Sequence, residues 1–430
     1  METYQTPLLK RKSNINVTVP GSKSITNRAL LMAAMAEGTT ILSGVLFSDD
    51  SRVFVKALQQ LGFPVTVDEA KKQVTITGFG GRIPKESAQI YVGSAGTAAR
   101  FLTAFVAMSP GVYRLDSSEQ MKKRPMKELL DALAQLGAKI HYLEERDTFP
   151  MEIKGISPTE SIGQISLNID RSSQFLSALL MTAPCNMKKL DIVLTGTRSA
   201  RSYVEMTEQM MKQFGHPGVE KLSANHYSVS EACYQAQEYQ VEPDVSAACY
   251  FYAMAAITGS RAVVQHMRRD SLQGDMKFLH LLESMGCSLQ WEGEQLYVQG
   301  PGEGKLSGID ADMGDFSDQT LTLAAIAPFA NSPVRVRNVG HIRGQECDRL
   351  FAIEKNMKKM QVPCEVYEDG FEIRPAMPKA ALIETFEDHR VAMAFAVTGT
   401  AAEGIVIENP SCCRKTFENY FDVLNQVVNA

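Results

Sequence analysis

The sequence predicts an α/β fold of two domains, each built from three copies of one helix–strand–helix–strand module. Six segments share one plan: a polar start, an Ala/Leu/Met-rich helix, a small residue that ends it, and a β-rich run. A second helix and another strand follow in most copies. The six starts recur roughly every 71 to 76 residues, near Ser24, Thr97, Ser173, Ser246, Asp318 and His389.

The two helices of a module differ in their apolar pattern. The first, as in "SKSITNRALLMAAMAEG" or "DVSAACYFYAMAAITG", is apolar nearly all round, which predicts a buried helix. The second, as in "ALQQLGFPVTV" or "LLESMGCSLQW", keeps one polar face and is expected to lie at the surface. Four of the second helices end at a glycine suited to a helix C-cap before the chain returns to a strand.

The last module is incomplete, and this predicts how the termini are used. The sixth copy ends in "TFENYFDVLNQVVNA" with no later strand, while "NINVTV" near the N-terminus has no module of its own. We therefore expect the N-terminal strand to complete the last module. Domain I would comprise residues 1–20 and 241–430 and domain II residues 21–240, with crossings near 20–22 and 238–243. Two adjacent crossings are typical of a hinged pair of domains that closes.

The composition and charge of the chain disfavour several classes of protein. The chain has 430 residues, 44% of them hydrophobic and 22% charged, as in ordinary globular proteins. No apolar leader and no run of 18 apolar residues is present, so we expect a cytoplasmic protein without a membrane partner. A net charge of −5 without a basic tail disfavours nucleic acid. The eight cysteines lack metal-binding spacing, so no metal and no cofactor is expected.

Cations and hydroxyls gather where the modules begin. Helix N-termini offer unpaired N–H groups and the positive end of the helix dipole, which favour anions. "GSKS" is not a nucleotide-binding loop, because Ser22 rather than glycine precedes the lysine. If one cleft gathers the module starts, it would bind several phosphates and carboxylates through Lys23, Ser24, Arg28, Arg124, Ser172, Ser173, Arg349, Arg390 and Lys415.

Three further residues are candidates for catalysis or for stacking on a substrate. Asp318, at the fifth helix start, is either a helix N-cap or a base that accepts a proton from a substrate hydroxyl. Glu346, in "IRGQECDRL", is the corresponding candidate for an acid. Tyr203 is either a half-buried aromatic residue or a ring that stacks on a substrate.

These segments together resemble the EPSP synthase (3-phosphoshikimate 1-carboxyvinyltransferase) family along essentially the whole chain. The resemblance is carried by "PGSKSITNRALLMAAMAEGTT", "GSAGTAARFLTA", "KKRPMKELLDAL", "SSQFLSALLMTAP", "DQTLTLAAIAPFA", "ECDRL", "EDHRVAMAFA" and "RKTF". It implies two domains of three βαβαββ units each, an inside-out α/β barrel with buried helices. It also implies a cofactor-independent transferase of the shikimate pathway, monomeric and inhibited by glyphosate. The enolpyruvyl group of phosphoenolpyruvate would pass to the 5-hydroxyl of shikimate 3-phosphate through a tetrahedral intermediate, with release of phosphate.

The resemblance also implies roles for single residues. Shikimate 3-phosphate would be bound by Lys23, Ser24, Arg28, Ser172, Ser173, Tyr203, Asp318, His341 and Gln345. Phosphoenolpyruvate would be bound by Lys23, Gly96, Arg124, Gln174, Arg349, Arg390 and Lys415. Asp318 would take the proton of the 5-hydroxyl, and Glu346 or Lys23 would handle the proton transfers at the methylene carbon.

Four positions depart from the family pattern: Ser94, Ala200, His341 and Gln345. Three of them lie on the side expected to bind shikimate 3-phosphate. Gln345 stands where the family commonly has lysine, and the loss of that charge costs on the order of 1 kcal/mol unless Arg343 or a protonated His341 compensates. Two alternatives therefore stay open at this point. One is a related enolpyruvyl transferase with another phosphorylated ring as acceptor. The other is a non-catalytic binding protein, which the retention of Asp318 and Glu346 disfavours.

Overall fold

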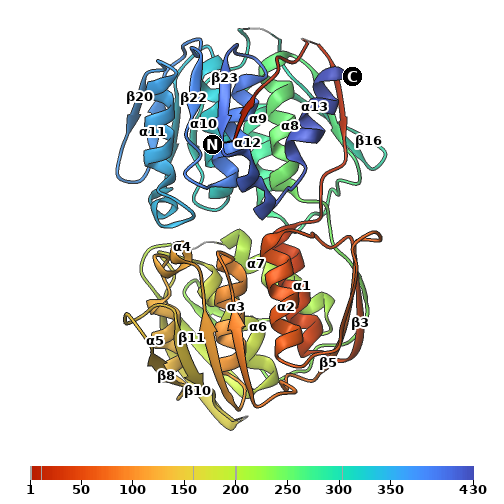
Figure 1. Cartoon of the computed structure of the whole chain (residues 1–430), viewed down its shortest axis with the longest axis vertical. Helices are drawn as coiled ribbons and strands as arrows, with labels where there is room; N and C mark the ends of the chain where they lie inside the picture. The colour runs from red at the N-terminus through yellow and green to blue at the C-terminus, as the bar shows by residue number, and fades with distance from the viewer. Residues whose placement is uncertain (1, 11, 158, 199–200, 303) are drawn as a thin grey trace. The chain divides into compact units, whose positions relative to one another are not determined.

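The structure, a computed structural model, describes residues 2–10, 12–157, 159–198, 201–302 and 304–430. It divides into two units, each shown in Figure 1. Unit 1 comprises Met1–Pro20 and Glu242–Ala430, and unit 2 comprises Gly21–Val241. At the first crossing, a side chain on Gly21 would overlap the carbonyl oxygen of Gly44, so only glycine fits there.

The second module of unit 2 shows the plan of the first five modules. Two parallel strands flank a buried helix, and an antiparallel pair continues the sheet in the order β6-β7-β9-β8. A second helix joins the parallel pair to the hairpin, which makes a βαβαββ unit. Its elements are β6 (Ser87–Tyr91), α3 (Gly96–Ala107), β7 (Val112–Asp116), α4 (Glu119–Lys122), α5 (Lys127–Gln135), β8 (Lys139–Tyr142) and β9 (Met151–Lys154).

The other two modules of unit 2 repeat this sheet. The third has the order β10-β11-β13-β12 and consists of β10 (Thr159–Asn168), α6 (Gln174–Thr182), η1 (Ala183–Cys185), β11 (Met187–Thr195), α7 (Arg201–Gln213), β12 (Glu220–Ser223) and β13 (His226–Ser230). The first has the order β14-β3-β5-β4, and its leading strand comes from the end of the unit. It consists of α1 (Lys23–Met35), β3 (Glu37–Ser43), α2 (Asp49–Gln60), β4 (Val65–Asp68), β5 (Gln73–Phe79) and β14 (Glu238–Gln240).

Unit 1 contains modules four and five, each with a four-stranded sheet. Module four consists of β2 (Asn14–Val17), α8 (Val245–Thr258), β15 (Arg261–Val264), η2 (Gly274–Met276), α9 (Lys277–Ser284), β16 (Ser288–Glu292) and β17 (Gln295–Gln299). Module five consists of β18 (Asp310–Asp312), η3 (Ser317–Gln319), α10 (Thr320–Ile326), η4 (Ala327–Phe329), β19 (Val334–Arg337), η5 (Gly340–Gly344), α11 (Arg349–Lys359), β20 (Cys364–Val366) and β21 (Phe371–Ile373).

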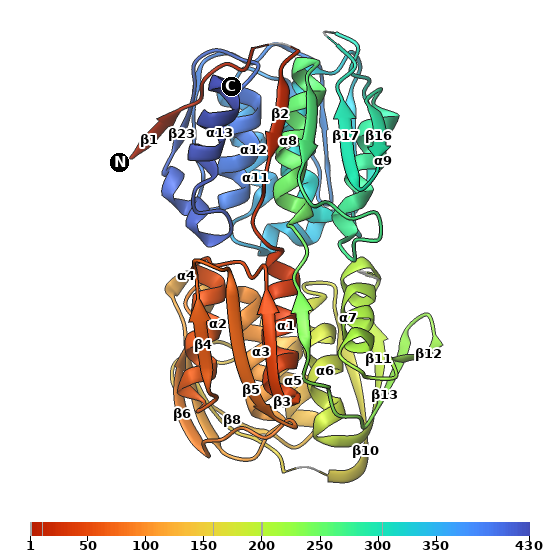
Figure 2. The ribbon, with the colours of Figure 1, turned by 90° about the vertical axis from the view of Figure 1, so that its right-hand side faces the viewer.

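The sixth module corrects the prediction for the N-terminus. Its sheet of β22 (Ala381–Ile383) and β23 (Ile405–Glu408), with α12 (His389–Gly399), η6 (Pro410–Lys415) and α13 (Tyr420–Asn429), is completed by β1 (Thr3–Gln5). β1 pairs antiparallel with β23, beside which it lies in Figure 2. The "NINV" strand β2 instead pairs parallel with β15 of module four. The prediction that the "NINVTV" strand completes the last module was therefore wrong, because β1 does so. β1 is held by Tyr4, whose ring packs on Phe421 and whose hydroxyl bonds Asn425 at 2.6 Å.

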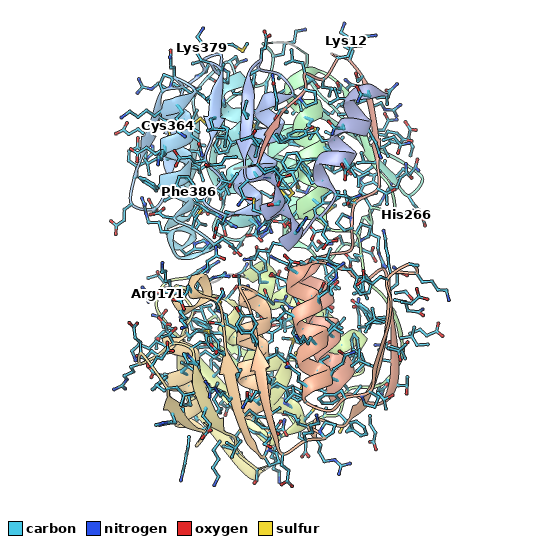
Figure 3. All side chains as sticks on the ribbon, viewed as in Figure 1. Lys12, Arg171, His266, Cys364, Lys379 and Phe386 are labelled. Carbon is cyan, nitrogen blue, oxygen red and sulfur yellow. The ribbon has the colours of Figure 1, made fainter. Side chains whose placement is uncertain are left out.

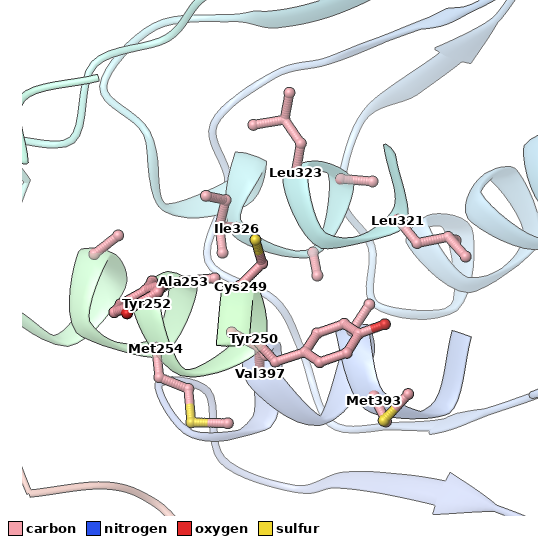
Figure 4. Close-up of a cluster of buried hydrophobic side chains, with 14 of the residues drawn as sticks. Cys249, Tyr250, Tyr252, Ala253, Met254, Leu321, Leu323, Ile326, Met393 and Val397 are labelled. Atoms are coloured by element: carbon pink, nitrogen blue, oxygen red, sulfur yellow. The ribbon is translucent and has the colours of Figure 1, made fainter. Parts of the chain in front are cut away.

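The first helices form the interior of each unit. In α8, α10 and α12 the apolar side chains are buried, and Figure 4 shows Cys249, Leu323 and Val397 from these three helices in one cluster. In unit 2, α3 packs against both α1 and α6. Charged side chains such as Lys379 and Arg171 are exposed (Figure 3). Among the described residues, no helix is both long and apolar enough to span a bilayer.

Candidate active site

In unit 2, the start of α1 presents Lys23 beside a buried carboxylate. The hydroxyl of Ser22 caps the helix by accepting the N–H of Ile25. The Nζ of Lys23 lies 3.8 Å from Oδ2 of Asp50, which is itself buried near the start of α2. Ser24 is partly exposed beside Lys23. The two side chains thus lie at a helix N-terminus, as the sequence predicted.

Arg28 is buried in the interior of unit 2 and bonded there. It is only 2% exposed, and burial lowers the pKa of its guanidinium to about 10. It donates to the hydroxyls of Thr207 at 2.9 Å and Ser177 at 3.2 Å. It also donates to the backbone carbonyls of Ser24 and Tyr203. Four of its five N–H groups therefore have acceptors within the described residues, which leaves one for a ligand.

Gly96, the first residue of α3, makes room for Arg124. A Cβ atom on Gly96 would lie 2.7 Å from Cζ and 2.8 Å from Nη2 of Arg124, well inside ordinary contact. The Nη1 of Arg124 also lies 3.5 Å from the carbonyl oxygen of Ser94. The Ser94 hydroxyl itself is 2.6 Å from that of Ser118. The guanidinium thus lies directly over the helix N-terminus, where an anion is favoured.

The start of α6 brings three more predicted residues together. Ser172 and Ser173 are buried, and the Ser172 hydroxyl accepts the N–H of Gln174 at 3.3 Å. The Nε2 of Gln174 donates to Oγ1 of Thr97 at 3.1 Å, which joins α6 to the first turn of α3. Tyr203 is half-buried on α7. Ala200, one of the four departures, lies outside the described residues.

In unit 1, Arg349 lies among carboxylates at the start of α11. It is 1% exposed, and its Nε and Nη2 donate to the two oxygens of Asp388 at 2.8 and 3.3 Å. Nη2 also donates to Glu346 at 3.0 Å, and Nη1 donates to Asp318 at 3.4 Å and to Oε1 of Gln345. Burial alone would lower the pKa of Arg349, but these carboxylates reverse the effect and raise it.

Asp318 links the two arginines expected to bind phosphoenolpyruvate. Its Oδ2 accepts from Nη2 of Arg390 at 2.7 Å, while its Oδ1 faces Arg349. The Asp318 side chain is 22% exposed, whereas both arginines are buried. Burial lowers the pKa of Arg390, but the charge of Asp318, together with those of neighbouring ionisable groups, reverses this effect and raises the pKa.

Glu346 and Lys415 form a second ion pair beside Arg349. The Nζ of Lys415, at the end of η6, lies 3.3 Å from Oε1 of Glu346, and both side chains are largely buried. The other oxygen of Glu346 accepts from Arg349. Glu346 is therefore held between two cations.

The positions that depart from the family pattern on unit 1 have defined partners. The Nε2 of His341 lies 2.7 Å from the hydroxyl of Ser317, next to Asp318. Arg343, which the sequence offers as a substitute for the missing lysine, has protein partners of its own. Its guanidinium is bonded to Asp348 at 2.9 Å and to the carbonyl oxygens of Tyr367 and Glu368.

Two buried carboxylates were missed by the sequence reasoning. Asp388 is fully buried, caps α12 through the N–H of Arg390, and orients Arg349. Its position directly before a predicted helix, in "EDHR", is typical of a helix N-cap and could have indicated this role. Asp275, on η2, is bonded by the hydroxyl of Ser246, and its Oδ1 has no hydrogen-bond partner among the described residues. Burial first, and then the charge of Asp318, raise the pKa of Asp275 to about 7.

Comparison with known proteins identifies the family. A sequence model described as EPSP synthase (3-phosphoshikimate 1-carboxyvinyltransferase) matches residues 10–424. The chain belongs to the EPSP synthase family. Members of the family transfer the enolpyruvyl group of phosphoenolpyruvate to shikimate 3-phosphate in the shikimate pathway, and this is the function of the chain.

The relatives cover nearly the whole chain. A 3-phosphoshikimate 1-carboxyvinyltransferase from Trichormus variabilis is 46% identical over 422 residues, which are 98% of each protein. The chloroplastic protein of Petunia hybrida is 38% identical and is covered over 82% of its length. The prediction that the chain is a 3-phosphoshikimate 1-carboxyvinyltransferase is confirmed.

Solved structures confirm the fold. The EPSP synthase of Acinetobacter baumannii has a TM-score of 0.83 at 24% identity and is covered over 98% of its chain. The enolpyruvyl transferase NikO of Streptomyces tendae has a TM-score of 0.75 at 13% identity. The predicted α/β fold with three repeats in each half is thereby confirmed.

Proposed function

We propose that the residues around Arg349 in unit 1 and the helix-start residues of unit 2 have the roles that the resemblance to the family implies. The observation that supports this most directly is the Asp318 carboxylate between Arg349 and Arg390, beside the Glu346–Lys415 pair. Two guanidinium groups suit the carboxylate of phosphoenolpyruvate, since arginine binds such groups with parallel hydrogen bonds.

Binding of that carboxylate would also activate the base. The N–H groups of Arg349 are fully used by protein acceptors, so an incoming carboxylate must replace some of them. Asp388 is fully buried, whereas Asp318 is partly exposed and is bonded less closely to Arg349. We infer that the ligand displaces Asp318, which then loses cationic partners and becomes a stronger base for the 5-hydroxyl of shikimate 3-phosphate.

The chemical steps then balance within the two substrates. The 5-hydroxyl oxygen bonds to C2 of phosphoenolpyruvate as its proton passes to Asp318, and C3 gains a proton to give the tetrahedral intermediate. The bond from C2 to the phosphate oxygen then breaks, C3 loses a proton, and phosphate leaves. Glu346 and Lys23 are the proposed groups for the proton transfers at C3, and their division of labour stays a prediction.

In unit 2, the proposed partners are the anionic groups of both substrates. Arg124 and Gln174 would bind the phosphate of phosphoenolpyruvate, as would Lys415 of unit 1. Ser172 and Ser173 would bind the phosphate of shikimate 3-phosphate, with Lys23, Ser24, Arg28 and Tyr203 contributing to the same ligand, as would His341 and Gln345 of unit 1. A monomeric state, a cytoplasmic location and closure of the two units stay predictions.

The test is turnover of an Asp318→Asn variant, which keeps the shape and removes the base. Phosphate release should fall by about 10²- to 10⁴-fold. Asp315→Asn, at an exposed ion pair with Lys277, is the matched control and should retain turnover. Unchanged turnover in Asp318→Asn would refute the assignment of the base.

A further inference from the structure

Arg100 lies one turn after Gly96 on α3, and no substrate role follows from the sequence for it. It is 2% exposed, and its guanidinium lies 5.4 Å from the ring centre of Phe175 on α6. Nη1 donates to Oε1 of Gln174 at 2.7 Å, and Nη2 donates to the carbonyl oxygen of Pro125 at 3.0 Å. The buried guanidinium of Arg100 thus bonds Gln174, a proposed anion-binding residue, and the backbone of Pro125, which directly follows Arg124.

The bond to Gln174 fixes which way its amide faces. Arginine has only donors, so the amide oxygen must face Arg100 and the amide nitrogen must face the other way. The nitrogen then donates one hydrogen to Thr97, three residues before Arg100 on the same helix. Its second hydrogen has no acceptor among the described residues. Without Arg100, the amide could rotate and present its oxygen, which would repel an anion.

The bond to Pro125 acts on Arg124 through the backbone. The Arg124 N–H is already bonded to the carbonyl oxygen of Met121 at the end of α4. Arg100 holds the carbonyl group of the next residue, Pro125, so the chain is bonded at Arg124 itself and again one residue later. Gly96, one turn earlier on α3, leaves space for the Arg124 guanidinium. The first two turns of α3 are therefore a common support for Arg124 and Gln174.

We propose that Arg100 is a positioning residue, which orients the Gln174 amide and holds the Arg124 segment so that both donate to the phosphate of phosphoenolpyruvate. The inference rests on the proposed roles of Gln174 and Arg124. It adds that their donor geometry depends on one buried arginine that does not itself contact the substrate.

The experiment compares Arg100→Met and Arg100→Lys in steady-state kinetics with both substrates varied. Arg100→Met, which fills similar space without a donor, should raise KM for phosphoenolpyruvate about tenfold, the loss expected for hydrogen bonds to a charged group. KM for shikimate 3-phosphate should stay within about twofold. Arg100→Lys should fall between, since an ammonium group lacks the fork that reaches both acceptors.

Thr103→Val is the matched control for packing of the same helix. Thr103 is fully buried on α3, and its hydroxyl bonds only the Ala99 carbonyl of its own helix among the described residues. This variant should leave both KM values unchanged. Equal increases of both KM values in Arg100→Met, with a lowered unfolding midpoint, would show a merely structural role and overturn the proposal.

A double-mutant cycle separates this inference from the function on which it rests. Gln174→Ala should raise KM for phosphoenolpyruvate, and adding Arg100→Met should then cost clearly less than it does alone. An unchanged KM in Gln174→Ala would overturn the assignment of Gln174 and the amide part of this proposal. A raised KM in Gln174→Ala with an unchanged KM in Arg100→Met would overturn only the role of Arg100.

Discussion

The contact between Gly96 and Arg124 gives a prediction whose size follows from the structure. Gly96→Ala adds one methyl group, whose carbon would lie 2.7 Å from Cζ of Arg124, whereas ordinary contact begins near 3.4 Å. The guanidinium must therefore move by roughly 0.7 to 1 Å, and a misplacement of that size costs as much as 10²-fold in rate. We expect kcat/KM for phosphoenolpyruvate to fall about 10- to 100-fold, because Arg124 no longer meets the phosphate in its present position.

The assay is phosphate release at varied phosphoenolpyruvate and saturating shikimate 3-phosphate, with KM for the second substrate as the internal control. The fold should be preserved, since Gly96 is the first residue of a helix and alanine favours helix formation. If the effect passes through Arg124, adding Gly96→Ala to Arg124→Met should cost little more. An unchanged kcat/KM in Gly96→Ala, or full additivity with Arg124→Met, would refute the reasoning.

Four further predictions follow from unit 1 and from the family. Asp388→Asn should lower kcat/KM for phosphoenolpyruvate about tenfold or more in steady-state kinetics, because the bidentate acceptor of Arg349 is lost; an unchanged value would contradict the orienting role of Asp388. Gln345→Lys should lower KM for shikimate 3-phosphate about five- to tenfold by restoring a charge-assisted bond, and a higher KM would contradict it. The pKa of Asp275 is raised to about 7 in the folded chain, whereas the unfolded chain releases this proton near pH 4. Between about pH 4 and 7 the folded chain therefore binds one proton more than the unfolded chain, and the free energy of unfolding falls as the pH rises. The free energy of urea unfolding of Asp275→Asn, relative to the original chain, should therefore increase over that range by at least ~1 kcal/mol, and a pH-independent difference would exclude the raised pKa. Glyphosate should inhibit in competition with phosphoenolpyruvate, and inhibition unaffected by that substrate would argue against a shared site.

The repeat was predictable because the buried helices carry a strong signal. An α-helix surrounded by other elements is apolar on all sides, and the six helices of this kind stand out in the sequence. β1 was not predictable in the same way. It has only three residues, too few for an alternating pattern to stand out, and its position depends on the packing of Tyr4 against α13. A strand of this length is defined by its partner rather than by its own residues.

Much of the site was also visible in the sequence, but its internal pairing was not. Arg349 and Asp388 are 39 residues apart, so no local pattern reveals that one orients the other. In the sequence, Arg100 lies within an apolar helix and has no visible partner. Only the fold brings Gln174 and Pro125 to its guanidinium. The sequence thus identifies which charges are present, while the three-dimensional structure determines which of them are bonded to each other.

The central claim is tested most directly by phosphate release from the purified chain with phosphoenolpyruvate and shikimate 3-phosphate, each alone and both together. Release should occur only when both are present, with one phosphate for each enolpyruvyl group found on the acceptor by mass spectrometry. Release from phosphoenolpyruvate alone, or no release with both substrates, would contradict the account.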